Sequence, residues 1–197
     1  MKVFLAGASG VLGRRLVPLL VEAGHEVVGM TRSESKRSLL EALGAEPVVG
    51  DVFDRDGLAA AVAASMPDLV MSQVTDLPDD PERIGEYTDA NARIRREGVA
   101  NLLDAARQSG VGRFLGQSVA WELPGDGGRA VAYMEEAILA AGGTVLRYGQ
   151  LYGPDTFHRS TPPPPPRIHV DKAARRTLSV LSAPSGIVEL TEEDSPP

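Results

Sequence analysis

The chain opens with V-F-L-A-G-A-S-G-V-L-G, residues 3–13, in which an apolar run from Val3 to Ala6 leads into three glycines. Gly7, Gly10 and Gly13 are spaced G-x-x-G-x-x-G, and the segment that follows them is amphipathic. An apolar run, a glycine-rich turn and a helical pattern in this order are typical of a buried parallel strand that passes directly into a helix. The stretch therefore predicts a β-α unit at the start of the chain.

This turn has the properties of a phosphate site. A helix that begins near Gly10 presents free N–H groups and the positive end of its dipole, and glycines let the backbone approach a diphosphate closely. Spaced glycines alone are weak support, since a chain with 21 Gly produces them by chance and a β-α turn can be purely structural. The helical pattern that follows, with Gly24 as its C-cap, favours a nucleotide. We expect the cofactor to contact Gly7, Ala8, Ser9, Gly10, Val11, Leu12 and Gly13.

Composition narrows the class of protein. A chain of 197 residues fits one domain, and a net charge of -7 without a run of Lys or Arg argues against a nucleic-acid partner. The absence of cysteine excludes disulfides and thiolate chemistry, and the three histidines have no metal-binding spacing. Because no signal peptide and no apolar stretch of roughly 20 residues are present, we expect a cytoplasmic protein with a small-molecule substrate and no membrane contact.

Strand and helix patterns alternate along the chain. The strand-like runs cover Val3–Ala6, Val27–Met30, Glu46–Val49, Leu69–Ser72, Arg113–Gln117 and Thr144–Arg147. The helical patterns cover Val11–Ala23, Ser35–Leu43, Asp56–Ala64, Ile84–Ser109 and Arg129–Ala141. This alternation predicts an α/β fold, a doubly wound parallel sheet with helices on both faces. We expect Pro18 to bend the first helix, because proline removes a backbone hydrogen bond.

Two segments are expected outside regular structure. The polar, proline-punctuated residues Val74–Pro81 follow the fourth strand and predict a loop in the crevice where ligands bind in open sheets. Thr161–Pro166 includes five consecutive prolines, which we interpret as a stiff surface connector rather than a partner-docking motif. Beyond it the pattern predicts a helix over Ile168–Leu181, a strand over Gly186–Leu190 and a frayed tail from Thr191. The expected division is 1–154 for the nucleotide domain and 155–197 for a reduced C-terminal cap packed on it.

Four sequence elements together resemble the extended and atypical short-chain dehydrogenase/reductase group, the NAD(P)-dependent epimerase/dehydratase-like proteins. The resemblance runs from Met1 to about Pro154 and resumes weakly afterwards. Its elements are G-A-S-G-V-L-G at 7–13, G-D-V-F-D at 50–54, Asn91 with N-L-L-D-A-A at 101–106, and L-R-Y-G-Q-L-Y-G-P at 146–154. The resemblance implies a Rossmann fold and a nicotinamide cofactor, and homodimers are common in the group. It also implies that Asp51 and Val52 lie beside the adenine, although Asp51 could be an ordinary turn residue.

Cofactor selectivity is read at the end of the second strand, where an acidic residue would bind the ribose 2′-hydroxyl of NAD. This chain has Thr31 and Arg32 there instead. An arginine can pair with a 2′-phosphate, so we predict NADP, with NAD as the alternative. Gln73 after the fourth strand and Tyr148 at the sixth are further expected cofactor contacts, although Tyr148 also fits a packed tyrosine with a satisfied hydroxyl.

The catalytic part departs from the family. The Tyr-x-x-x-Lys pair is missing, because Tyr133 is followed four residues later by Ala137. Ser118 is either a hydrogen-bond donor to substrate or a strand-end cap. Tyr133 and His158 are candidate proton donors whose alternatives are a half-buried packing residue and a plain loop residue. Asn91 is expected to satisfy backbone groups inside its own helix.

Two functions fit these observations. The first is an NADP-binding oxidoreductase of the atypical short-chain type that acts on a small carbonyl-type metabolite. The second is a non-catalytic, NAD(P)-binding regulatory or redox-sensing protein, which needs no Tyr-Lys pair. A sugar-nucleotide epimerase fits less well, because the lysine is missing and the C-terminal region is short.

Overall fold

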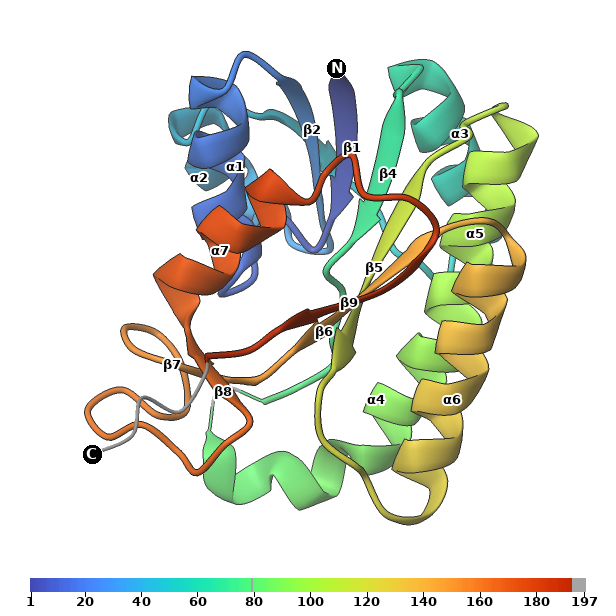
Figure 1. The fold of residues 1–197 in the computed structure, drawn as a ribbon. Helices are drawn as coiled ribbons and strands as arrows, with labels where there is room; N and C mark the ends of the chain where they lie inside the picture. Colours follow the sequence, from blue (N-terminus) through green and yellow to red (C-terminus); the bar gives the residue numbers. More distant parts are fainter. Residues whose placement is uncertain (79, 193–197) are drawn as a thin grey trace.

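A computed structural model describes residues 1–78 and 80–192. Its centre is a seven-stranded parallel sheet in the order β3-β2-β1-β4-β5-β6-β9 (Figure 1). The strands are β1 (Lys2–Ala6), β2 (Glu26–Thr31), β3 (Glu46–Val49), β4 (Leu69–Ser72), β5 (Phe114–Val119), β6 (Thr144–Tyr148) and β9 (Gly186–Leu190). A second, two-stranded sheet pairs β7 (Gln150–Tyr152) with β8 (Arg167–His169). The doubly wound parallel sheet predicted from the alternating patterns is confirmed.

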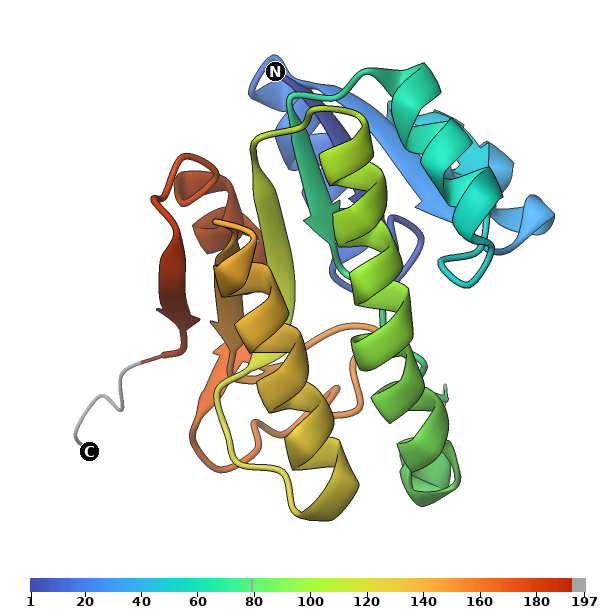
Figure 2. The ribbon, with the colours of Figure 1, turned by 90° about the vertical axis from the view of Figure 1, so that its right-hand side faces the viewer.

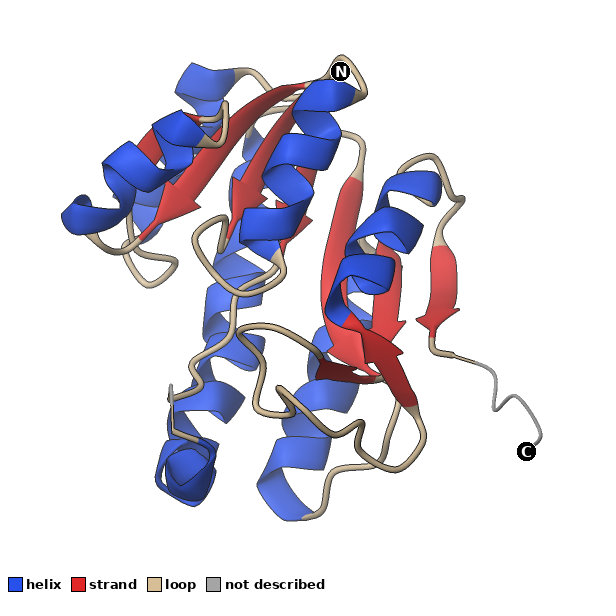
Figure 3. Ribbon diagram, turned by 90° about the vertical axis from the view of Figure 1, so that its left-hand side faces the viewer, coloured by secondary structure: helices blue, strands red, loops and turns tan. Residues whose placement is uncertain are grey.

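Helices cover both faces of the sheet. One face carries α1 (Gly13–Glu22), α2 (Arg37–Ala42) and α7 (Val170–Ser179), and Figure 3 shows α1 and α7 in front of the strands. The other carries α3 (Arg55–Ser65), α5 (Val99–Gln108) and α6 (Gly125–Ala140), shown in Figure 2. Alternate residues of each strand enter opposite cores, as expected for a sheet buried on both sides.

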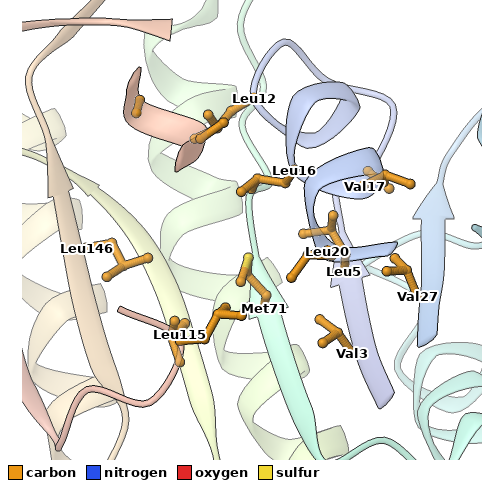
Figure 4. Packing of buried hydrophobic residues seen from close by; sticks show 14 of the residues in the cluster. Val3, Leu5, Leu12, Leu16, Val17, Leu20, Val27, Met71, Leu115 and Leu146 are labelled. Atoms are coloured by element: carbon orange, nitrogen blue, oxygen red, sulfur yellow. The ribbon is translucent and has the colours of Figure 1, made fainter. Parts of the chain in front are cut away.

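The core below α1 shows how the sequence pattern produces this packing. Leu12, Leu16 and Leu20 recur at helical spacing and face Leu5 and Met71 from adjacent strands (Figure 4). These side chains are at most 4% exposed. Burying each contributes about 1.5–3 kcal/mol, so this stripe fixes α1, and with it the glycine turn, on β1 and β4.

The predicted helix over Ile84–Ser109 is not one regular helix. It consists of a 3-10 segment (Pro81–Tyr87), α4 (Thr88–Arg93), a π-helical segment η3 (Ile94–Gly98) and α5. Its C-terminal half packs on the sheet, whereas α4 extends past the carboxyl ends of the strands in Figures 1 and 2. The 3-10 segment and α4 therefore lie beside the carboxyl edge of the sheet (Figures 1 and 2).

Several predicted boundaries need correction. The first helix begins at Gly13, not near Gly10, and ends at Glu22, with Pro18 inside it. The helix expected from Ile168 starts only at Val170, because residues 167–169 form β8. The β7 strand was not predicted at all.

The expected fraying of the C-terminal tail is wrong for Glu192. Its amide donates to the Arg167 carbonyl at 2.8 Å, and its carboxylate accepts the Tyr152 hydroxyl at 2.8 Å. The remainder of the predicted frayed segment, residues 193–197, lies outside the described residues. The predicted loop after β4 is present at residues 74–78, whereas Pro81 begins the 3-10 segment. The predicted C-cap Gly24, with φ +80°, follows the actual C-cap residue Ala23.

Candidate nucleotide-binding site

The glycine turn lies where the strand order reverses, between β1 and β4. Gly7 adopts φ +84°, and a Cβ there would lie 2.5 Å from the Gln73 carbonyl oxygen. A Cβ on Gly13 would lie 2.3 Å from the Gly7 oxygen. These two glycines therefore serve the tight turn and the close packing of α1, at the switch point where open sheets bind ligands.

Gly10 has a different part in the same turn. It is exposed, and a Cβ there would approach only the Gly7 oxygen, at 3.2 Å. Within the part of the chain that the structure describes, the amides of Ser9, Val11 and Leu12 donate to no acceptor. An open backbone with free N–H groups at the start of α1 fits a dinucleotide's diphosphate.

Hydroxyl groups fix the end of β2 against this turn. The Ser9 and Thr31 hydroxyl oxygens are 2.8 Å apart, and Thr31 Oγ1 also accepts the Ser33 amide at 3.3 Å. The next residue, Arg32, extends across to the loop after β4, where its Nη2 donates to Asp76 Oδ1 at 3.2 Å. The Arg32 side chain is 51% exposed, so it is open to a further anion.

Asp51 and Val52 form the turn after β3. Asp51 Oδ1 accepts the Phe53 amide at 3.0 Å, which is the geometry of an ordinary Asx turn. Asn101 Nδ2 donates to the Val52 carbonyl at 2.8 Å, so this asparagine of the N-L-L-D element anchors the turn. The Arg93 guanidinium lies 4.0 Å from the Phe53 ring centroid, a cation–π contact.

A buried chain of hydrogen bonds runs from the crevice to α7. The Thr177 hydroxyl donates to the Ala173 carbonyl at 2.8 Å, and the Tyr148 hydroxyl, 2.6 Å from Thr177 Oγ1, therefore donates to that oxygen. Gln73 Nε2 donates to the Tyr148 oxygen at 3.3 Å. Burial raises the pKa of Tyr148 to about 12, so its hydroxyl stays protonated at neutral pH.

This chain of bonds leaves one polar atom without a partner. Gln73 is 5% exposed, and its Oε1 is buried and accepts no hydrogen bond from the described residues. Reversing the amide would leave its NH₂ group in the same condition. Leaving a buried polar group without a partner costs about 1–3 kcal/mol of folding free energy. Gln73 therefore has an unused hydrogen-bonding position beside the glycine turn that a ligand could occupy. Tyr148, expected as a direct cofactor contact, is 2% exposed, and its hydroxyl oxygen accepts the hydrogen bond from Gln73.

The Ser118 hydroxyl is already engaged. It donates to Glu135 Oε1 at 2.5 Å, and Arg147 binds both oxygens of the same carboxylate. The single hydroxyl proton is thereby used, which favours the strand-end alternative for Ser118. The signal was in the sequence, since Glu135 falls on the α6 positions that face the sheet, next to Met134 and Ile138.

Tyr133 and His158 lie on separate elements. Tyr133 is 52% exposed on α6. His158 lies in the loop after β7, where its amide donates to Thr156 Oγ1 at 3.2 Å. The described contacts join neither residue to Ser118, so the three predicted catalytic residues do not form a hydrogen-bonded triad.

Arg15 attaches the His158 loop to the glycine turn. Its guanidinium donates to the carbonyls of Val11 and Pro154, both at 2.8 Å, and to the carboxylates of Asp155 and Asp171. The Arg15 side chain is 16% exposed. The loop after β7 is therefore held beside the start of α1.

The prediction for Asn91 is wrong. Its side-chain oxygen accepts the Asp76 amide at 3.2 Å, so it binds the loop after β4 rather than its own helix. Asn91 thereby ties α4 to the crevice loop.

Fold and turn together define a dinucleotide-binding protein of the Rossmann class, with its cradle at the β1–β4 switch point. A family model described as NAD(P)H-binding matches residues 7–142, and the chain belongs to this family.

Relatives and solved structures agree with this assignment. The 3-diazoavenalumate denitrifying reductase of a Streptomyces species is 36% identical over 79% of this chain and 58% of its own length, so the chain spans less than two thirds of that relative. The UDP-glucose 4-epimerase of Thermus thermophilus in complex with NAD has a TM-score of 0.81 at 20% identity, covering 97% of this chain and 78% of that one. ChuY, an anaerobillin reductase from Escherichia coli O157:H7, has a TM-score of 0.74 at 20% identity, and the match covers 100% of both chains.

Two absences hold for the described residues, 1–78 and 80–192. None of their helices has the length and apolar character needed to cross a membrane. They also contain no group of three or more His, Cys, Asp or Glu side chains arranged to hold a metal ion.

Proposed function

We propose that this protein is an NADP-dependent oxidoreductase that reduces a small carbonyl-type metabolite. The observation that carries the proposal is the glycine turn, in which exposed Gly10 and free amides at the start of α1 lie at the switch point of the sheet. The reductase names of the Streptomyces relative and of ChuY support the reaction class.

Each part of the dinucleotide has a proposed partner. The backbone of residues 7–13 holds the diphosphate, while Ser9 and Thr31 fix the neighbouring strand end. Arg32 binds the 2′-phosphate by exchanging its contact with Asp76. Asp51 and Val52 lie beside the adenine. Gln73, held by Tyr148, accepts a hydrogen bond from the nicotinamide half through its unpartnered Oε1.

Bound at this turn, NADPH would supply the hydride that reduces the substrate carbonyl carbon. The carbonyl oxygen takes one proton, so the products are an alcohol and NADP⁺. The chain's own residues must exclude water from the crevice and deliver that proton. Positioned proton transfer contributes about 10² to 10⁴ in rate.

His158 is the proposed proton donor. Its imidazole makes no hydrogen bond with the described side chains, and Arg15 holds its loop beside the cofactor turn. Tyr133 is the second candidate. Ser118 contributes less directly, because its proton is bound to Glu135.

A second function has its own support. No described side chains form an assembled acid–base pair around Ser118, Tyr133 and His158, which is what a redox-sensing protein without turnover would show. Homodimerisation would suit either function.

One experiment separates the two functions. The purified protein is titrated with NADPH and NADH by calorimetry and then assayed for coenzyme oxidation with aldehydes, ketones and quinones. We expect tighter binding of NADPH and turnover of at least one carbonyl compound. Tight binding without turnover on the whole panel would favour the sensor, and no binding of either coenzyme would reject both.

A further inference from the structure

The segment from α4 to α5 carries three arginines close together, and one of them differs from the others. Arg93 donates to Glu97 at 2.7 Å, and Arg96 donates to Asp126 at 2.6 Å. Arg95 has no hydrogen-bond or ion-pair partner among the described residues.

Arg95 also lies on the buried face of its helix. The residues three and four positions away on either side are all buried: Asn91, Ala92, Gly98 and Val99. Side chains at these spacings share one face of an α-helix, and Arg95, which lies in the π-helical segment η3, is itself partly buried beside that stripe. Burial lowers the pKa of Arg95 below its usual value.

The elements around Arg95 lie near the carboxyl edge of the sheet. Asn91, one turn earlier, binds the loop after β4, and η3 itself packs against α6, which follows β5. Arg95 therefore belongs to a segment between that loop and α6. This segment lies on the α5–α6 face of the sheet, across from α1 and its glycine turn (Figure 2).

A partly buried guanidinium without a counter-charge is unfavourable, and proteins usually keep such groups paired. We propose that Arg95 binds a carboxylate of the substrate, so that the protein selects anionic carbonyl compounds. A planar guanidinium can hold a carboxylate through two parallel hydrogen bonds, which would orient the substrate as well as attract it. This inference rests on the proposed function, since it assigns the substrate class of that site.

The test uses carbonyl compounds in pairs of free acid and methyl ester, such as 4-formylbenzoate with its methyl ester and pyruvate with methyl pyruvate. Each is titrated by calorimetry into protein saturated with NADP⁺. Wild type should bind at least one acid about tenfold more tightly than its ester. Arg95→Met should abolish the preference, and Arg95→Lys should retain part of it.

Arg93→Met and Arg96→Met are matched controls from the same helix, and both should keep the preference. Thermal unfolding adds a second measurement. Removing an unpaired, partly buried charge should leave the Tm of Arg95→Met unchanged or raised, whereas a structural role would lower it.

Three results would overturn the proposal: no acid binds better than its ester, the preference survives in Arg95→Met, or Arg95→Met weakens NADPH binding as strongly as acid binding. Failure of the proposed function gives a different pattern. In that case acids would still bind through Arg95, but no carbonyl compound would oxidise NADPH.

Discussion

Arg32 and Asp76 form an ion pair across the mouth of the crevice, with Nη2 3.2 Å from Oδ1. The arginine follows β2 and the aspartate lies in the loop after β4, so the pair joins two loops that flank the glycine turn. Asp76 neutralises the charge on which the predicted NADP selectivity depends. Under the proposed function, the 2′-phosphate of NADP and Asp76 compete for one guanidinium.

The first prediction follows from that competition. Arg32→Ala should weaken NADPH binding about tenfold, since a charge-assisted hydrogen bond contributes about 1.5–3 kcal/mol and this side chain is half exposed. NADH binding should change less than about twofold. Asp76→Asn should strengthen NADPH binding by freeing the arginine. Calorimetry with both coenzymes measures all three effects, and unaltered NADPH affinity in Arg32→Ala would refute the selectivity argument.

The second prediction separates the glycines by function. Gly13→Ala should destabilise the fold by about 1–3 kcal/mol, because its Cβ would overlap the Gly7 carbonyl. Gly10→Ala should leave the Tm nearly unchanged but weaken coenzyme binding at least tenfold, because its Cβ would project into the open side of the turn. Denaturant unfolding and coenzyme titration together check this. Equal loss of stability in both variants would contradict it.

The third prediction concerns Gln73. The 3-acetylpyridine analogue of NADP⁺ carries a methyl group in place of the carboxamide NH₂. If Gln73 Oε1 accepts that N–H, wild type should prefer NADP⁺ over the analogue about fivefold, as one net hydrogen bond of about 1 kcal/mol provides. Gln73→Leu should bind both equally, and Gln117→Leu is the control that retains the preference. A preference unchanged in Gln73→Leu would assign Oε1 to another partner.

The fourth prediction is a pH dependence of stability. A hydrogen bond from Arg96 lowers the pKa of Asp126 to about 2, from an ordinary value of 3.8. A depressed pKa stabilises the folded state above the ordinary pKa, and this contribution disappears as pH falls from about 4 to about 2. Asp126→Asn should therefore be less stable than wild type at pH 7, with the difference vanishing near pH 2. Asp89→Asn removes a carboxylate that has no ion-pair partner among the described residues, and it should show no such convergence.

The fifth prediction tests the proposed proton donor. His158→Gln should lower the reduction rate at neutral pH at least about hundredfold, because the proposed proton donor is removed. Tyr133→Phe should change the rate less than about threefold. The reverse result would assign the proton to Tyr133.

The fold could be predicted from the sequence because its signals are local. Apolar runs, helical periodicity and glycine punctuation identified all seven strands of the main sheet and the turn between β1 and α1. The boundary at Ile168 could not be predicted in this way. A three-residue strand such as β8 depends on pairing with β7, a contact across the proline-rich connector.

The site was less accessible from sequence, since its polar partners are distant along the chain. In the sequence, the Ser118 hydroxyl has no visible partner, but in the structure it donates to Glu135, which Arg147 also binds. Asn91 likewise has no visible partner in the sequence, and in the structure its side-chain oxygen accepts the Asp76 amide. Arg95 does have a local signal, because it is a charged residue between buried positions of a helical pattern. Its neighbours Arg93 and Arg96 obscure this signal, because only the structure shows that they have carboxylate partners and that Arg95 has none among the described residues.

Arg15 joins the start of α1 to the loop that carries His158. A diphosphate bound at the first turn of α1 would therefore also restrict the motion of the loop that carries His158, the proposed proton donor. Such linkage implies an ordered kinetic scheme in which the coenzyme adds first and departs last, and product-inhibition patterns would reveal that sequence of events.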